Sequence, residues 1–276
     1  MTSVKFSVLL SVYSQENEDS FRRALESILV QTVMPSEVII VKDGIIGKKL
    51  ECVIEKFKHN SIFRVKVVGT KQNRGLGPAL NYGLSFVEYP YVARVDSDDI
   101  NLRNRFEKQT LFLDANPKVD IVGSQIQEFE EVDEKIVYKG IRRVPLVNKD
   151  IRQYSKLRNP MNHMTVMFRK ECVTNVGGYR KIPGFEDYDL WLRMLKNGHI
   201  FANIADVLIL ARTSNGFENR RGGMAYFVKS FRARKMFYKE GNISAGYLCA
   251  GVVASGLSSL LPKAVRKFVY RHVLRG

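Results

Sequence analysis

The sequence predicts an α/β fold, in which a mostly parallel sheet carries helices on both faces and a helical segment follows toward the C-terminus. In the first hundred residues, short continuous apolar runs alternate with stretches of helical periodicity. Such alternation indicates βαβ units, whose parallel strands are buried on both faces. Hydrophobic residues make up 45% of the 276-residue chain and charged residues 26%. This composition is typical of a folded globular protein and excludes a disordered or collagen-like chain.

The N-terminal elements follow in regular order. Residues 7–13 form the first apolar strand, which is too short for the hydrophobic region of a secretory signal. Asp19 and Ser20 can cap a helix that continues through 21–29. The following predicted elements are strands at 37–41, 63–68 and 91–95 and helices around 50–57 and 78–87.

The second part of the chain has a different pattern. Residues 119–130 and 135–138 are predicted to be extended and joined by a polar turn. Residues 213–223 are rich in Gly, Asn, Ser and Arg, which indicates a loop. The remaining predictions are extended segments at 163–168 and 201–211 and helices near 102–113, 186–196, 225–239, 243–261 and 264–274.

The sharpest chemical signal is a run of acids directly after the strand at 91–95. Asp96 and Asp98 alternate along an extended chain and can point the same way, and Asp99 follows them. Carboxylates placed together repel unless a cation or a donor lies between them, and Mg²⁺ or Mn²⁺ binds such hard oxygen ligands together with substrate phosphates. The run therefore predicts a site for a divalent metal and a nucleotide diphosphate. The alternative is a solvated acidic turn before the next helix.

A glycine-rich segment, residues 73–83, opens the helix after the third strand. Its glycines let the backbone approach a ligand closely, and a helix N-terminus favours phosphate. It is not a dinucleotide-binding fingerprint, because Gly75 and Gly77 lack the third glycine and do not follow the first strand. Taken alone, it is equally compatible with a plain turn.

Together these segments resemble the nucleotide-binding half of an inverting family 2 glycosyltransferase with the GT-A fold, of the kind that builds bacterial O-antigen and exopolysaccharide. The resemblance covers about residues 4–212 and rests on motifs that occur in the family's order. These motifs are Ser7-Val-Leu-Leu-Ser-Val-Tyr13, Val38-Ile-Ile-Val-Lys-Asp43-Gly44, Asn73-Arg-Gly with Ala79-Leu-Asn81-Tyr-Gly83, Asp96-Ser-Asp98-Asp99, Asn159-Pro-Met-Asn-His163, Val176-Gly-Gly-Tyr179 and Gly184-Phe-Glu186-Asp187-Tyr-Asp189-Leu-Trp191.

The resemblance implies a role for each matching residue on the donor side. Tyr13 and Asp43 would hold the uracil of a UDP-sugar, and Ser11 would contact the base through its backbone. Arg74 would lie near the base or the pyrophosphate. The ribose would bind Asp96, and Asp98 would bind Mn²⁺ or Mg²⁺ through the donor's diphosphate.

On the acceptor side, the resemblance implies that Asp187 is the general base. Without the resemblance, the preferred interpretation of Asp187 is an acid favoured at a helix N-terminus. Glu186 would support Asp187, Asp189 would position the acceptor or cap the helix, and His163 would line the acceptor side or be a structural histidine. Trp191 would stack under a sugar ring or belong to the core.

The sequence departs from the family pattern at two places. Lys42 stands where an acid usually precedes Asp43, and a solvated lysine is the simpler interpretation. The loop at 212–223 offers Arg212, Arg220 and Arg221, but not the histidine that relatives often place there. Arg212 and Arg220 therefore remain the candidates for contacts with the diphosphate.

The basic charge is concentrated near the C-terminus. The 57 residues from 220 to 276 hold twelve Lys and Arg but one acid, so they carry +11 of the net charge of +16. The uncharged stretch at 243–261 is nearly long enough to span a bilayer, but its three glycines and four serines make it a weak transmembrane helix. The basic segment after Pro262 can lie on an anionic membrane surface. The alternative is a helical hairpin packed on the catalytic part, whereas no recognition motif supports nucleic-acid binding.

These observations predict two parts. Residues 1–212 would be the catalytic domain, with a nucleotide-binding half (1–100) and an acceptor half (101–212), and residues 213–276 would be a loop and basic, partly apolar helices. The acceptor would be a saccharide linked to undecaprenyl diphosphate, at the cytoplasmic face of the bacterial cell membrane. Three scattered cysteines agree with a reducing compartment.

Two other functions fit parts of this pattern. A nucleotidyltransferase that forms the activated sugar would need a glycine-rich loop with a basic triphosphate clamp after the first strand, and none follows Ser11. A binding module that has lost catalysis would not need both Asp98 and Asp187.

Overall fold

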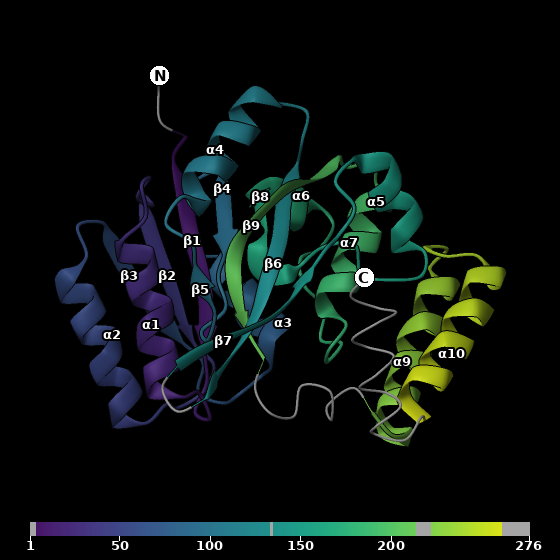
Figure 1. The fold of residues 1–276 in the computed structure, drawn as a ribbon, viewed down its shortest axis with the longest axis horizontal. Coiled ribbons are helices and arrows are strands. Elements are labelled where there is room, and N and C mark those ends of the chain that lie inside the picture. Colours follow the sequence, from purple (N-terminus) through teal and green to yellow (C-terminus); the bar gives the residue numbers. More distant parts are fainter. Residues whose placement is uncertain (1–3, 133–134, 214–221, 261–276) are drawn as a thin grey trace.

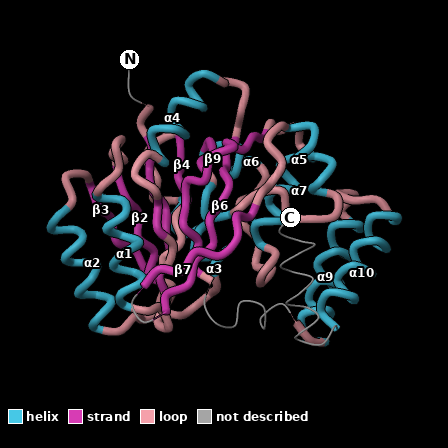
Figure 2. The backbone as a smooth tube through the Cα atoms, in the orientation of Figure 1, coloured by secondary structure: helices cyan, strands magenta, loops and turns pink. Residues whose placement is uncertain are grey.

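The computed structural model describes residues 4–132, 135–213 and 222–260 (Figure 1). One nine-stranded sheet runs through the centre of the molecule, in the order β3-β2-β1-β4-β8-β6-β9-β5, with β7 paired to β6. Figure 2 shows α1 and α2 at one end of this sheet and α9 and α10 at the other. The predicted α/β fold with C-terminal helices is confirmed.

The N-terminal strands are parallel, as the alternation of elements predicts. They are β1 (Phe6–Val12), β2 (Glu37–Lys42), β3 (Arg64–Gly69) and β4 (Tyr91–Arg94). The connecting helices are α1 (Glu18–Leu29), α2 (Lys48–Asn60) and α3 (Leu76–Leu84). Because side chains alternate along a strand, β1 sends Val8 and Leu10 into a core with α1 and α2 and sends Leu9 into a second core with α3. Both faces are therefore covered.

The second part of the sheet is mixed. Its strands are β5 (Ile100–Asn101), β6 (Ile121–Val132), β7 (Lys135–Arg142), β8 (Met167–Arg169) and β9 (Phe201–Arg212). β6 and β9 are parallel, whereas β8 is antiparallel to both β4 and β6. The helices of this part are α4 (Arg105–Ala115), α5 (Asn148–Ser155), α6 (Lys170–Asn175) and α7 (Glu186–Lys196), of which α5 and α6 were not predicted.

The predicted strand at 163–168 is wrong in its first half. His163–Thr165 form a 3₁₀ turn, and the strand begins only at Met167. Both the backbone N–H and the hydroxyl of Thr165 donate to the carbonyl of Asn162, at 2.9 and 2.8 Å. These local bonds stabilise a turn in place of a strand.

Two antiparallel helices complete the described chain, α9 (Met224–Lys239) and α10 (Ala245–Leu260) (Figure 1). They pack against α7 through a separate apolar cluster that includes Tyr188, Leu192, Ala233 and Phe237. Within the described ranges, no helix is long and apolar enough to cross a membrane. The predicted basic helix at 264–274 lies outside the described residues.

Candidate active site

The ends of β1 and β2 lie together, and their loops meet at Asp43. The backbone N–H of Asp43 donates to the carbonyl of Val12 at 2.8 Å. Its buried carboxylate accepts from the backbone N–H groups of Arg74 and Gly75, at 2.7 and 2.9 Å. Asp43 therefore fixes the glycine-rich loop against the end of the sheet.

The other predicted donor residues surround this point. Ser11 is half-buried in β1, and the Tyr13 side chain, just beyond the strand, is 40% exposed. The side chain of Arg74 is exposed. Gly44 adopts a φ of +88°, and a Cβ there would lie 2.8 Å from the backbone nitrogen of Asn73. Only glycine lets the two loops approach this closely.

The three acids after β4 form one cluster. Oxygen atoms of Asp96, Asp98 and Asp99 all lie within 4.8 Å of one another. Burial, followed by the charges of Asp96 and Glu16, raises the pKa of the Asp98 carboxyl to about 7. Asp99 is buried, and one of its oxygens has no hydrogen-bond partner among the described residues. Hard carboxylate oxygens with an unsatisfied buried acceptor fit a divalent cation such as Mg²⁺ or Mn²⁺.

A buried arginine lies beside this cluster. Arg94 is the one charged residue in the apolar run of β4, and its guanidinium pairs with Asp96. Two other nitrogens of that guanidinium have no hydrogen-bond partner among the described residues. The charge of Arg94 also opposes the rise in the pKa of Asp98 and of Asp187 that burial causes. Arg94 is thus a buried cation whose charge acts on both the acid cluster and the predicted base.

Arg212 lies at the end of β9, next to the acid cluster. Its backbone N–H donates to Asp99 at 2.8 Å, and its Nε donates to the carbonyl of Asp98 at 3.1 Å. Its guanidinium pairs with Glu131 at 2.8 Å and lies 4.7 Å from the ring centroid of Phe129. This loop candidate therefore lies at the acid cluster. Arg220, the other loop candidate, lies outside the described residues.

Asp187 lies in the first turn of α7 and is held by two donors. Its Oδ2 accepts from the amide of Asn159 at 2.5 Å, and its Oδ1 accepts from the backbone N–H of Tyr188 at 2.7 Å. Burial raises the pKa of Asp187, while these bonds and the charges of Arg94 and Arg142 oppose the rise. A carboxylate with a raised pKa is a better proton acceptor than an ordinary aspartate. The adjacent Glu186 is fixed by the backbone N–H of Gly184 at 2.7 Å.

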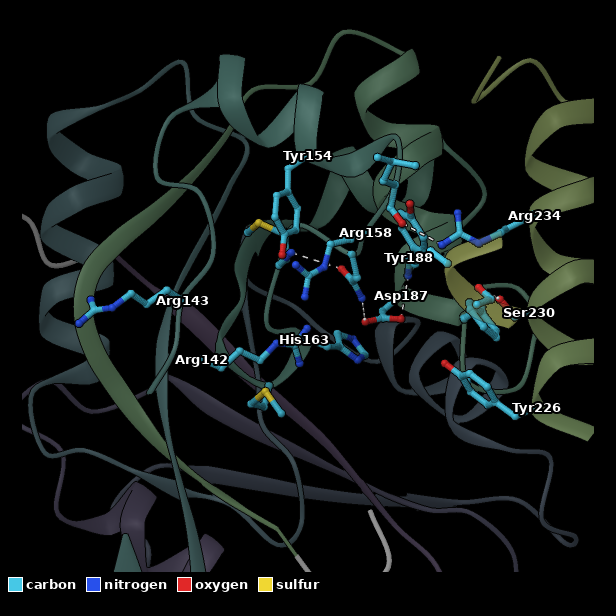
Figure 3. A pocket seen from close by; sticks show the side chains of 18 of the residues that line it. Arg142, Arg143, Tyr154, Arg158, His163, Asp187, Tyr188, Tyr226, Ser230 and Arg234 are labelled. Carbon is cyan, nitrogen blue, oxygen red and sulfur yellow. Dashed lines mark hydrogen bonds between the residues drawn. The ribbon is translucent and has the colours of Figure 1, made fainter. Parts of the chain in front are cut away.

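Asp187 lines a pocket of about 380 Å³, which is within the range of small-ligand sites (Figure 3). Its walls come from β6, β7, the 158–164 segment, α7, α9 and α10. The charged lining residues are Glu128, Arg142, Arg143, Arg158, Asp187 and Arg234. His163 lines the same pocket, with Nε2 3.0 Å from the hydroxyl of Tyr179, and burial lowers its pKa so that the ring is neutral.

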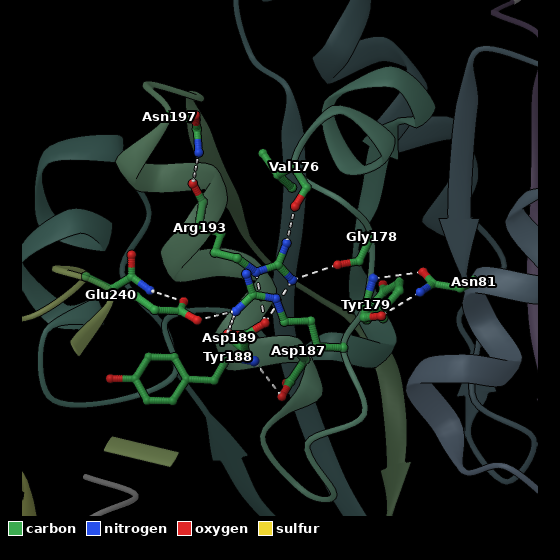
Figure 4. Close-up of polar contacts among 12 residues, drawn as sticks. Asn81, Val176, Gly178, Tyr179, Asp187, Tyr188, Asp189, Arg193, Asn197 and Glu240 are labelled. Atoms are coloured by element: carbon green, nitrogen blue, oxygen red, sulfur yellow. Dashed lines mark hydrogen bonds and ion pairs between the residues drawn. The ribbon is translucent and has the colours of Figure 1, made fainter. Parts of the chain in front are cut away.

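Two predicted acceptor residues do not reach the pocket. Asp189 is fully buried, and its carboxylate pairs with Arg193 at 2.8 Å (Figure 4). Trp191 is also fully buried, where its ring packs edge-on against His163 and Phe201. Burial keeps both side chains from the pocket in this structure. Trp191 belongs to the core, as its alternative interpretation states, whereas Asp189 does not cap α7 but pairs with Arg193 within that helix.

Several residues of the site were not singled out from the sequence. Asn159 and Asp99 belong to the motifs that carry the resemblance, but no role was assigned to them. Arg94 could have been identified from the sequence, because it is a single charged residue inside an apolar strand. The arginines of the pocket could not, because they come from separate elements that only the tertiary structure brings together.

A family model described as glycosyl transferase family 2 matches residues 7–173. The UDP-Gal:α-D-GlcNAc-diphosphoundecaprenol β-1,3-galactosyltransferase of Escherichia coli is 38% identical over 272 residues, covering 98% of this chain and 97% of its own. An amylovoran biosynthesis glycosyltransferase of Erwinia amylovora is 35% identical over 274 residues, covering 98% and 100%. A mannosyltransferase of Pyrobaculum calidifontis, solved with GDP-Man and Mn²⁺, aligns with a TM-score of 0.64 over 96% of this chain and 79% of that one. At 15% identity, that last likeness shows the fold alone.

Proposed function

The chain belongs to glycosyl transferase family 2, and on that premise we propose that it transfers a sugar from a UDP-sugar to a saccharide linked to a lipid through a diphosphate. The product would enter a bacterial surface polysaccharide such as O-antigen or exopolysaccharide. Two relatives that align over nearly their whole length support this: one is named for a UDP-galactose donor and a diphosphoundecaprenol acceptor, the other for amylovoran biosynthesis.

The donor would bind along the carboxyl ends of β1, β2 and β4. Tyr13 and Asp43 would hold the uracil with the backbone of Ser11, and the exposed Arg74 would lie near the base or the pyrophosphate. Oδ1 of Asp43 accepts from the backbone N–H of Arg74 and from the hydroxyl of Thr70, whereas Oδ2 accepts from the backbone N–H of Gly75 and has a second lone pair for the ring N–H. Asp96 would contact the ribose from its place beside Arg94.

A divalent cation, Mn²⁺ or Mg²⁺, would be held by Asp98, with Asp99 close by and the donor's diphosphate completing the ligands. The unsatisfied oxygen of Asp99 and the raised pKa of Asp98 support this assignment, because both are relieved by a cation. Bound there, the metal supplies charge stabilisation for the leaving nucleoside diphosphate.

The transfer would proceed in one inverting displacement. The acceptor hydroxyl gives its proton to the Asp187 carboxylate as its oxygen forms the new bond to the anomeric carbon. The bond from that carbon to the diphosphate oxygen breaks on the opposite face, and its electron pair leaves with UDP. Asn159 and the backbone N–H of Tyr188 keep Asp187 oriented toward the acceptor. His163 would line the acceptor site as a neutral ring, and Glu186 would support Asp187 from the preceding position.

One observation carries this proposal. The hydrogen-bonded carboxylate of Asp187 lines a pocket of about 380 Å³, and the buried charge of Arg94 acts on both that carboxylate and the acids at the strand ends. The charge of Arg94 therefore acts on both the proposed base and the proposed donor site.

The decisive experiment is a donor screen. UDP-galactose and UDP-N-acetylglucosamine would be offered with Mn²⁺ or Mg²⁺ and a synthetic lipid diphosphate sugar, and the linkage would be determined by NMR. We expect transfer with inversion at the anomeric carbon that stops when EDTA is added. Retention of configuration would contradict the role of Asp187, and full activity in EDTA would contradict the role of Asp98.

We propose further that residues 1–212 are the catalytic domain and that residues 213–276 place it on the inner face of the cell membrane. α10 holds no charged residue, and Val253 and Leu257, one turn apart, are 61% and 63% exposed. Sixteen residues span about 24 Å, which is shorter than the hydrocarbon core of a bilayer. The helix would therefore lie in the interfacial region of the membrane, and basic residues would strengthen its binding to anionic lipids.

Vesicle flotation tests this placement. Leu257→Glu should reduce binding to vesicles that contain anionic lipid, whereas Ile62→Glu, at an 85% exposed position on the other side of the molecule, should not. Equal flotation of both variants, or equal binding to neutral and anionic vesicles, would refute the proposal.

A further inference from the structure

The pocket beside Asp187 is lined by more positive than negative charge. Four arginines face two acids among its lining residues, Glu128 and Asp187. One of those acids is the proposed base, which interacts with the acceptor hydroxyl. A neutral sugar does not compensate the net positive charge of this lining, whereas an anion does, because a guanidinium offers paired N–H donors to phosphate oxygens.

Part of this positive charge is the buried side chain of Arg234. It extends from α9 toward α7, its side chain is more than nine-tenths buried, and its Nη2 donates to the carbonyl of Leu157 at 2.8 Å (Figure 3). Its Nε and Nη1 are buried without a hydrogen-bond partner among the described residues. A buried charge with unsatisfied donors is costly unless a partner compensates it, and an anionic ligand would be such a partner.

Two other arginines approach the same space. The guanidinium of Arg158 lies 5.4 Å from the ring centroid of Tyr154, which limits its freedom before any ligand arrives. Arg142, at the end of β7, is close enough to Asp187 for its charge to oppose the rise in that residue's pKa. Figure 3 shows Arg142 and Arg158 near Asp187, whereas Arg143 points away from it.

We propose that Arg142, Arg158 and Arg234 form a binding site for the diphosphate of the acceptor. The inference rests on the proposed function, in which the acceptor is a lipid-linked saccharide, and it specifies how that acceptor is recognised. The sugar hydroxyl lies at Asp187, and the diphosphate lies among the three arginines, of which Arg234 is on the side of α9 and α10 (Figure 3).

The position of α10 agrees with this orientation. Ala254 and Ser255 of α10 line the pocket, while Val253 and Leu257 on the same helix are exposed. A lipid chain that leaves the diphosphate would therefore meet the apolar face of α10. The two diphosphates of the reaction are bound in opposite ways: that of the donor by acids through a cation, and that of the acceptor by arginines directly.

The first test uses the unchanged protein and three probes, measured by calorimetry without donor. All three carry the same α-linked N-acetylglucosamine and the same undecyl chain, joined through a diphosphate, a monophosphate or a plain ether oxygen. We expect affinity to fall in that order, with the diphosphate bound at least about tenfold more tightly than the ether. Equal affinities would overturn the site, even if the protein transfers sugar to all three probes.

The second test uses variants. Arg142→Gln and Arg158→Gln should each raise the Kd for the diphosphate probe by about tenfold and leave the Kd for the ether probe unchanged. Arg232→Gln is the matched control, because Arg232 is an exposed arginine of α9 outside the pocket. Arg234→Gln should also raise the Kd for the diphosphate probe. If that variant does not fold, the variants of Arg142 and Arg158, which are less buried, still test the proposal.

A third measurement separates the two diphosphates. Binding of UDP with Mn²⁺ should be unchanged in Arg142→Gln and Arg158→Gln. If these variants lose UDP and keep their preference for the diphosphate probe, the arginines serve the donor and the proposal is wrong. Failure of all UDP-sugars as donors, with the probe preference intact, would contradict the proposed function and leave the arginine site standing.

Discussion

The acid cluster after β4 and the arginine pocket beside Asp187 handle charge in opposite ways. At the acid cluster, Asp96, Asp98 and Asp99 follow one strand within four residues, so like charges are forced together. In the pocket, arginines from separate elements bring positive charge around a single base. In our proposals, the acid cluster would hold a divalent cation and the arginine pocket would hold an anionic ligand.

If the proposed roles are correct, this difference would keep the two diphosphate substrates of the reaction apart. The acids would repel a phosphate group unless a metal ion lay between them. The arginines, in contrast, would attract a diphosphate without a metal ion. The buried guanidinium of Arg94 is common to both regions, because its charge acts on Asp98 and on Asp187. The following predictions test whether the acid cluster and the arginine pocket act separately, from the largest expected effect to the smallest.

The largest effect is expected for the base. Asp187→Asn keeps the shape and the contact with Asn159 but removes the proton acceptor, so kcat should fall by about 10²–10⁴-fold. Binding of UDP and of the diphosphate probe should remain. Steady-state kinetics and calorimetry measure the two properties, and Asp150→Asn on the exposed side of α5 is the control. Near-normal turnover would remove Asp187 from the mechanism.

The next effect is expected at the acid cluster. Asp98→Asn should lower the activity at saturating Mn²⁺ by about 10²-fold, because the cation that stabilises the leaving group is bound less well. UDP affinity should lose its dependence on Mn²⁺, whereas affinity for the diphosphate probe should stay. Titration of activity against Mn²⁺ measures the effect, with Asp114→Asn at the exposed end of α4 as the control. Loss of acceptor affinity in Asp98→Asn would show that the two regions are not separate.

A smaller effect is expected between α9 and α10. A Cβ at Gly251 would overlap the guanidinium of Arg234, which must then move. Gly251→Ala should raise the Kd for the diphosphate probe several-fold, although alanine favours a helix by up to about 1 kcal/mol over glycine. Thermal unfolding and calorimetry separate stability from binding. Gly246→Ala is the control, because a Cβ there has no neighbour closer than 4.0 Å. Unchanged probe affinity in Gly251→Ala would argue against Arg234.

The smallest effect is a shift in pH dependence. Asp187 acts as a base only when deprotonated, so activity should rise with pH through its pKa, which burial has raised. Asn159→Ala removes a donor that favours the charged carboxylate, so that pKa should rise further and the acidic limb of kcat/KM should move to higher pH. The variant should lose kcat/KM several-fold at pH values below the pKa of Asp187 and only slightly at pH values above it. A loss of equal size at every pH would mean that Asn159 has only a structural role; Asn60→Ala is the control.

Most of the fold could be predicted from the sequence, because it depends on local pattern. The strands β1, β2 and β4 and the helix α7 lie where apolar runs and helical periodicity put them. The turn at 163–165 could not be predicted, because Thr165 prefers a bond to Asn162 over continuing the strand. The short helices α5 and α6 were also not predicted.

For the site, the sequence by itself determined the residues whose chemistry comes from a contiguous motif. The acid run at 96–99, the glycine-rich loop and the Glu186-Asp187 pair each carry their signal in neighbouring positions. The approximate places of the acid run and the glycine-rich loop follow from the rule that loops at the carboxyl ends of parallel strands meet, whereas Glu186 and Asp187 open α7 and follow no parallel strand.

Only the tertiary structure decided which side chains reach solvent and which charges come together. It buried Trp191 and Asp189, which lie within four residues of the proposed base, because three consecutive turns of a core helix expose few of their positions. It also brought Arg142, Arg158 and Arg234 together from β7, the segment after α5, and α9. Burial and long-range charge depend on packing between distant segments, and no local pattern encodes that packing.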